Sequence, residues 1–371
     1  MKVLVTGGAG FIGSHLVDAL LARGHELRVL DALEAQVHGA ERKPPPWLPA
    51  AVDLRIADVR DRTAVRSALD GVEVVFHQAA AVGVGQSMYE IERYVSANTL
   101  GAAVLLEELV ERRDRLRRVV VASSMSLYGE GAYRDPDGAL VHPGLRPAAQ
   151  LEARRWEPED ERGRPLAPVP TAESAPLAPT SVYAVTKRDH EELFLAVGNA
   201  YGIPTVALRY FNVFGTRQAL GNPYTGVVAI FSSRLLHGRA PVLFEDGRQS
   251  RDFVHVSDIV AANLLAMEKD AAVGRTYNVG TGRATPVLAV ADALARALGV
   301  AVEPECTGRF RAGDIRHCFA DVSAIARELG FESRTTLEAG LAELLGWLRT
   351  QSPEDRVAEA SAALERRGLA R

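Results

Sequence analysis

The sequence predicts an α/β fold with a doubly wound parallel sheet, and three observations lead to that prediction. Apolar runs of strand length recur along the first 210 residues, and most precede a stretch with apolar residues at helical spacing. The first run leads into a glycine-rich turn, TGGAGFIG, between Thr6 and Gly13. The second run ends in an acid, Asp31. Strands that alternate with helices in this way form parallel sheets with helices on both faces.

The glycine-rich turn is suited to a phosphate group. Gly7, Gly10 and Gly13 have no Cβ, so the turn can be tight and a ligand can approach its backbone. The helix expected over Ser14–Arg23 directs its free N–H groups and positive dipole end toward that ligand. Asp31 can accept both ribose hydroxyls of an adenosine. The turn therefore predicts a Rossmann-type dinucleotide site, and an ordinary glycine-rich turn is the alternative.

The residues after Asp31 indicate which dinucleotide binds. Ala32 and Leu33 follow it, and no Arg is placed to meet a 2′-phosphate. This favours NAD over NADP.

Length and composition exclude several classes of protein. A chain of 371 residues is long enough for one large domain or two closely packed ones. A net charge of −4 gives no general attraction to nucleic acid or membranes. Cys306 and Cys318 are the only cysteines, so a disulfide framework or zinc ribbon is not supported. No signal peptide or spanning apolar stretch is visible, and we expect a cytoplasmic protein.

Apolar runs of strand length and apolar residues at helical spacing predict the remaining elements in order. Strands are expected over Lys2–Val5, Leu27–Leu30, Val52–Ile56, Val72–Phe76, Arg118–Ala122, Thr205–Tyr210, Val242–Phe244, Arg251–Val256 and Thr276–Val279. Beyond the first helix, others are expected over Thr63–Leu69, Tyr94–Val110, from Tyr183, Val227–His237, from Ser257 or Asp258 to Met267, Val287–Leu298, Asp321–Leu329 and Leu337–Leu348.

Two polar residues follow these strands. Asp58, after the third strand, either meets the amine of an adenine ring or caps the helix Thr63–Leu69, and both readings stay open. His77, after the fourth strand, is expected to serve packing or hydrogen bonding rather than catalysis.

Tyr183 and Lys187 are the candidate reactive pair. They are four residues apart on one helix, so their side chains share a face. A tyrosine with an ordinary pKa of about 10 is a poor base at neutral pH. A lysine ammonium beside it, together with the positive nicotinamide ring of NAD⁺, would stabilise its phenolate.

Several segments, in order, carry a resemblance to a known family. They are TGGAGFIG, Asp31, ADVRD, HQAA, SSMSLYG, YAVTK, RYFNVFG, RDFVHVSDI, YNVG and RAGDIRHCFAD. With them the chain resembles the extended short-chain dehydrogenase/reductases. More narrowly, it is similar to the NAD-dependent nucleotide-sugar epimerases typified by UDP-glucose 4-epimerase.

The resemblance implies roles for individual residues. Tyr183 is implied as the catalytic acid/base, Lys187 as the partner that lowers its pKa, and Ser124 as a hydrogen-bonding partner of Tyr183 and the sugar. The implied cofactor contacts are Gly7, Gly10, Phe11, Ile12, Gly13, Asp31, Asp58, Val59, Gln78, Ala79, Ala80, Asn98, Ala122, Tyr183, Lys187, Tyr210 and Val213. The implied substrate contacts are Ser124, Met125, Ser126, Tyr183, Asn212, Arg251 and Arg311. The two arginines would grip the diphosphate, because a guanidinium binds phosphate oxygens bidentately.

The resemblance also implies the reaction, which inverts a hydroxyl, by default at C4, of a UDP- or dTDP-sugar. It passes through a 4-keto sugar and retains NAD. A 4-ketoreductase or dehydrogenase of the same fold is one alternative, and a non-catalytic dinucleotide sensor is another. A homodimer is expected from the family. We expect residues 1–210 to bind NAD, 211–350, interleaved with them, mainly to bind the substrate, and 351–371 to form a tail.

The chain departs from the family pattern at two places. Related 4,6-dehydratases carry Asp-Glu where Met125 and Ser126 stand, so dehydration is not expected. Residues 130–179 form an insertion that ordinary UDP-glucose 4-epimerases lack, similar to the branch of dTDP-L-rhamnose 4-epimerases. It can cover the substrate, make an oligomer contact or be disordered. Asp135 and residues 159–161 stand where relatives have cysteine pairs, so no metal is expected.

Overall fold

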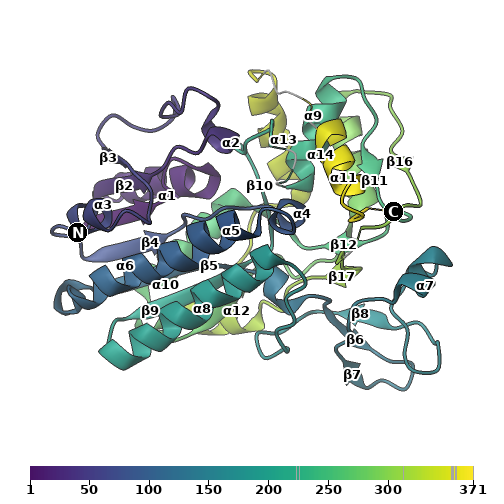
Figure 1. The fold of residues 1–371 in the computed structure, drawn as a ribbon, viewed down its shortest axis with the longest axis horizontal. Coiled ribbons are helices and arrows are strands. Elements are labelled where there is room, and N and C mark those ends of the chain that lie inside the picture. The colour runs from purple at the N-terminus through teal and green to yellow at the C-terminus, as the bar shows by residue number, and fades with distance from the viewer. Residues whose placement is uncertain (223, 225, 312, 352–354, 356, 371) are drawn as a thin grey trace.

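A parallel sheet of seven strands forms the centre of the computed structural model, which describes residues 1–222, 224, 226–311, 313–351, 355 and 357–370 (Figure 1). The strand order is β14-β9-β5-β4-β1-β2-β3, and every neighbouring pair is parallel. The strands are β1 (Lys2–Thr6), β2 (Glu26–Asp31), β3 (Asp53–Ile56), β4 (Val74–His77), β5 (Arg118–Ser124), β9 (Thr205–Tyr210) and β14 (Thr276–Val279). The predicted doubly wound parallel sheet is confirmed.

Helices cover both faces of this sheet. One layer contains α1 (Phe11–Ala22), α10 (Val256–Glu268) and α12 (Ser323–Leu329), and the other contains α3 (Arg62–Ala68), α6 (Gly101–Val110) and α8 (Val182–Tyr201). Side chains alternate along a strand, so Val3 and Val5 pack in the first layer and Leu4 packs in the second. This two-sided burial explains why the strands are apolar throughout.

The helix expected over Tyr94–Val110 is interrupted. Its first part is α5 (Ile91–Tyr94), its last part is α6, and a π-helical turn, η1 (Val95–Leu100), separates them. Asn98 in this turn bonds the backbone N–H and C=O of Ala81, at 2.7 and 3.1 Å. Such turns often accompany functional sites.

The region after residue 210 builds a third apolar core and three small sheets. The core contains α9 (Val227–Leu236), α11 (Val287–Leu298) and α13 (Leu337–Leu348). The sheets pair β10 (Asn212–Phe214) with β13 (Phe253–His255), β11 (Val242–Leu243) with β16 (Glu305–Cys306), and β12 (Ser250–Arg251) with β15 (Thr285–Pro286) and β17 (His317–Cys318). From this region, β14 adds an edge strand to the central sheet, and α10 and α12 pack on one of its faces. The division into a NAD-binding part (1–210), an interleaved substrate-binding part (211–350) and a tail (351–371) therefore stays a proposal.

Several boundaries differ from the sequence prediction by one to three residues, and two of the differences have a visible cause. The strand expected over Arg251–Val256 is divided at Asp252, because β12 pairs with β15 and β17 whereas β13 pairs with β10. The buried Asp252 carboxylate accepts hydrogen bonds from the N–H groups of Thr281 and Gly282. The next helix begins at Val256, one residue early, and the His255 ring caps it by accepting from the Ser257 N–H.

The insertion 130–179 is folded, so the disordered alternative is wrong for this segment. It forms a three-stranded antiparallel sheet of β6 (Ala132–Arg134), β7 (Leu140–Val141) and β8 (Ala167–Val169), with α7 (Ala148–Glu152) beside it. It lies next to β12 and β17 (Figure 1). The Glu130 carboxylate accepts the N–H groups of Arg316 and His317, which joins the insertion to β17.

The remaining short elements connect these layers. They are α2 (Ala35–His38), α4 (Val84–Ser87), η2 (Arg113–Arg115), η3 (Met125–Tyr128), η4 (Asp270–Ala272) and α14 (Val357–Glu365). Of the helices in the described ranges, none has both the length and the apolar character needed to cross a membrane.

Candidate active site

The glycine turn between β1 and α1, called the glycine cradle below, is packed too closely for side chains at two of its glycines. Gly7 has φ +69°, and a Cβ on it would lie 2.7 Å from the Ala79 nitrogen. A Cβ on Gly13 would lie 2.2 Å from the Gly7 oxygen. Gly10, the N-cap of α1, has no side chain to occupy the first N–H groups of that helix. The turn therefore fits the phosphates of a dinucleotide.

Asp31 is fixed at the end of β2. Its carboxylate accepts the N–H groups of Ala9 and Leu33, both at 2.9 Å, and the side chain is buried. Each carboxylate oxygen has a further lone pair, which suits two ribose hydroxyls. The residues around the turn therefore fit NAD.

Asp58 has a different local role from the helix cap considered above. Asp61 caps α3, accepting the N–H groups of Thr63 and Ala64. Asp58 binds the Arg60 guanidinium instead, and Arg60 holds the pKa of its carboxyl below the usual value. The cap reading is wrong, and contact with a bound adenine stays a prediction.

Ser124 and Tyr183 are joined by a hydrogen bond at the carboxyl edge of the sheet, and Lys187 lies one turn further along the same face of α8. Ser124 ends β5, and the other two lie on the first turns of α8. That helix starts where it does because Ser181 caps it, its hydroxyl accepting the Ala184 N–H at 3.1 Å. The hydroxyl of Ser124 also accepts from the Ser126 hydroxyl, at 2.9 Å.

The pKa of Tyr183 is not lowered as the sequence analysis expected. Loss of water raises the pKa of Tyr183 to about 12, and a hydrogen bond with Ser124 acts in the lowering direction. Burial lowers the pKa of Lys187 to about 7. Ser124, rather than Lys187, is thus the group that favours the phenolate here, and the lowering by Lys187 stays a prediction for the NAD-bound enzyme.

Other predicted cofactor residues serve the protein's own hydrogen bonds. The Gln78 amide donates to the Tyr210 hydroxyl at 3.0 Å, and that hydroxyl also bonds Asn263. Asn98 holds Ala81 and donates to the Thr186 hydroxyl at 2.9 Å. His77 bonds the Thr6 hydroxyl at 2.8 Å, so the expected hydrogen-bonding role is confirmed.

The remaining predicted residues lie at or just beyond the carboxyl ends of the strands. They are Phe11, Ile12, Val59, Ala79, Ala80, Ala122, Met125, Ser126 and Val213. Ligands of doubly wound sheets bind at this edge, and the roles of these residues stay predictions.

The two arginines predicted to bind the diphosphate both contact other groups of the protein. Arg251 donates to the carbonyl oxygens of Ile315 and Arg316, at 2.7 and 2.9 Å, so it also fixes the loop that precedes β17. Arg311, 42% exposed at its side chain, pairs with Asp314 at 2.7 Å. Its guanidinium lies 4.5 Å from the ring centre of Phe244, a residue that sequence analysis missed.

Asn212 carries an unpaired polar atom. Its Oδ1 is buried and has no hydrogen-bond partner among the described residues. A buried acceptor of this kind indicates a ligand or water partner, as expected beside a substrate.

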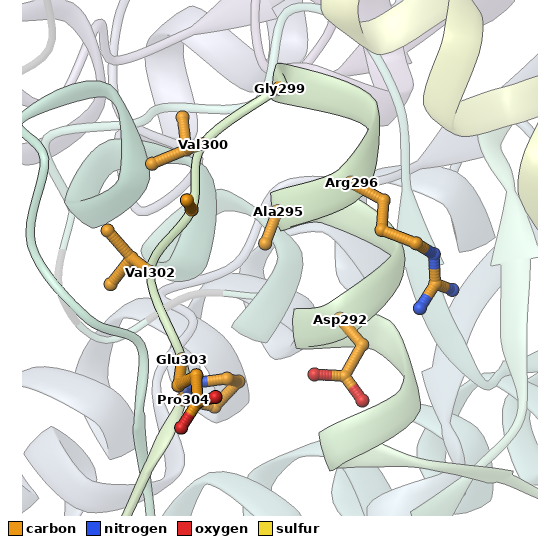
Figure 2. Close-up of a pocket in the computed structure, with 9 residues that line it drawn as sticks. Asp292, Ala295, Arg296, Gly299, Val300, Val302, Glu303 and Pro304 are labelled. Carbon is orange, nitrogen blue, oxygen red and sulfur yellow. The ribbon is translucent and has the colours of Figure 1, made fainter.

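A surface pocket lies away from this edge. Figure 2 shows it between α11 and residues 299–304, with a volume of ≈ 480 Å³. None of the predicted site residues lines it.

Comparisons with known proteins identify the family of the chain. Residues 3–147 and 160–280 match the NAD dependent epimerase/dehydratase family, and the chain belongs to that family. A dTDP-L-rhamnose 4-epimerase of Burkholderia thailandensis is 37% identical over 349 residues, which cover 94% of each chain.

Solved structures of epimerases share the fold of this chain. A UDP-glucose 4-epimerase of Thermotoga maritima, determined with UDP-glucose, has a TM-score of 0.77 and 31% identity, and the match covers 94% of this chain and 99% of that one. The Thermus thermophilus UDP-glucose 4-epimerase, determined with NAD, has a TM-score of 0.73 and 31% identity, covering 95% and 100%.

Proposed function

We propose that the chain is an NAD-dependent epimerase that inverts the C4 hydroxyl of a nucleotide-diphosphate sugar. The observation that carries this proposal is the hydrogen bond between Ser124 and Tyr183, with Lys187 one turn along the same helix face, at the edge of the sheet where the glycine turn also lies. Two features of the chain oppose dehydration as the reaction, because Met125 and Ser126 supply no carboxylic acid after Ser124.

The side chains divide the work of the reaction. Tyr183 takes the proton of the sugar hydroxyl and later returns it. Ser124 orients the hydroxyl oxygens of Tyr183 and of the sugar through hydrogen bonds. When bound, NAD supplies the hydride acceptor, and then the hydride donor, at the sugar carbon. Arg251 and Arg311 hold the diphosphate while the keto sugar rotates and presents its other face to the nicotinamide.

The substrate to test first is dTDP-L-rhamnose. The B. thailandensis relative with that name matches over 94% of the chain. We also propose a cytoplasmic location, which two free cysteines, Cys306 and Cys318, support.

The first prediction is epimerisation without net cofactor turnover. With a panel of dTDP- and UDP-sugars and only the NAD that copurifies, we expect NMR to show one sugar converting to its C4 epimer. Absorbance at 340 nm should show no steady change during turnover, because each hydride removed is returned. A steady change would instead establish the alternative function, a ketoreductase or dehydrogenase.

The second prediction is a homodimer formed by α5, η1 and α8. Four apolar side chains on these adjacent elements are exposed: Ile91, Val95, Leu100 and Val185. We expect light scattering to give twice the chain mass of 39.9 kDa for the wild type, and a monomer for Ile91→Arg/Val185→Arg. Val273→Arg, at a similarly exposed valine after η4, is the control and should stay dimeric. A monomeric wild type would contradict this prediction.

A further inference from the structure

His190 continues the catalytic face of α8. Tyr183, Lys187 and His190 follow one another at helical spacings of four and three residues, so they lie on one side of the helix. Lys187 is 4% exposed and His190 is fully buried. None of the roles described above uses this histidine.

The hydrogen bonds of His190 determine its tautomer. Its Nε2 lies 3.0 Å from the backbone oxygen of Asn98, and a carbonyl oxygen only accepts. Nε2 must therefore carry the proton. In a neutral ring Nδ1 is then an acceptor, and it lies 3.3 Å from Nζ of Lys187, which donates.

The surroundings keep the ring neutral. Burial, followed by the charge of Lys187, lowers the pKa of His190 well below its usual value. His77 from β4 packs against it at 5.0 Å between ring centres, and burial lowers the pKa of His77 to about 3. Lys187 therefore lies beside two neutral imidazoles, those of His190 and His77, and the phenol of Tyr183 precedes it by one turn on the same helix face.

The anchor of His190 belongs to the cofactor side of the site. Asn98 lies in the π-helical turn, and its side chain binds both backbone groups of Ala81, next to the run predicted to contact NAD. The histidine therefore connects that turn to Lys187. A lysine has four flexible side-chain bonds, so a fixed acceptor restricts where its ammonium group lies.

We propose that His190 is a positioning residue, which holds the ammonium group of Lys187 at the catalytic edge by accepting its hydrogen bond. This inference rests on the proposed function. Without the acceptor, the buried ammonium loses a partner, the neutral amine becomes favoured, and the side chain is less fixed.

The test compares His190→Leu with His190→Gln. Glutamine retains an acceptor and a donor, whereas leucine has neither. For His190→Leu we expect kcat to fall by about 10-fold or more while KM for the sugar stays nearly constant. Lys187 acts in its protonated form, so activity falls as pH rises through its pKa. A lower pKa moves that fall to lower pH, by about one pH unit in the leucine variant.

The outcomes separate positioning from packing. His190→Gln should recover most of kcat and the wild-type pH profile. The proposal is overturned if the leucine variant keeps the wild-type profile, or if glutamine is as impaired as leucine. If the wild type epimerises no sugar, the proposed function fails, and the next measurement still tests His190.

That measurement is the ring tautomer in the NAD-loaded enzyme. With ¹⁵N-histidine labelling, long-range NMR correlations should show one neutral Nε2–H ring that disappears in His190→Gln. Its Nδ1 resonance should shift in Lys187→Met, because the donor is lost. A His190 ring protonated at Nδ1 would overturn the proposal.

Discussion

Tyr183→Phe is expected to reduce kcat for epimerisation by about 10²–10⁴-fold, the usual contribution of a general acid–base group. The change removes only the oxygen that bonds Ser124. The ring remains, so KM for the sugar should change little. The measurement is steady-state epimerisation by coupled assay or NMR, together with the NAD content of the purified variant, which should equal that of the wild type.

Tyr94→Phe is the matched control. The Tyr94 ring meets Tyr183 edge to face, with ring centres 6.5 Å apart, but its hydroxyl donates to Gln86 at 3.1 Å. This variant should keep kcat within a few-fold. Equal activity of Tyr183→Phe and the wild type would remove Tyr183 from the mechanism.

Glu245→Ala is expected to cost about 3–5 kcal/mol of unfolding free energy, the usual effect of leaving a buried charge unpaired. That charge is Arg146, which loses its carboxylate, whereas Arg316 keeps two other acidic partners. The Glu245 carboxylate binds the guanidinium groups of Arg146 and Arg316, at distances of 2.8 to 3.0 Å. The side chains of all three residues are at most 2% exposed. Because Arg146 belongs to the insertion and Arg316 precedes β17, the loss should loosen both segments. Urea denaturation, monitored by tryptophan fluorescence, measures the effect.

Glu107→Ala is the control for this prediction. Glu107 also pairs with an arginine, Arg62, but both side chains lie at the surface. Exposed pairs contribute about 0–1 kcal/mol, so the control should unfold near the wild-type midpoint. A loss for Glu245→Ala no larger than that of the control would show that water reaches the two guanidinium groups.

The central sheet and the cofactor cradle follow from the sequence because their signals are local. Apolar strands, the glycine turn and Asp31 lie within one short segment, and the structure arranges them as expected. The spacing of Tyr183 and Lys187 likewise placed them on one helix face.

The features that sequence analysis missed depend on partners distant in the chain. The π-helical turn forms where Asn98 reaches Ala81 and Thr186, and no periodicity reports those bonds. The insertion resembled a disordered segment because its charges find partners only in the folded chain, such as Glu245. The sequence contains one signal for His190, its spacing of three residues from Lys187, which places both on one helix face. The Tyr-x-x-x-Lys pattern ends at Lys187 and does not include it.

The shared carboxylate of Glu245 has a consequence for protein engineering. A chimaera that transplants residues 130–179 into a relative would separate Arg146 from Glu245, which lies outside the transplanted segment. Deleting the same segment would remove Glu157, and Arg316 would lose one of its carboxylate partners. The unit that can be exchanged between enzymes is therefore discontinuous in sequence, and consists of the insertion together with the segments that contain Glu245 and Arg316.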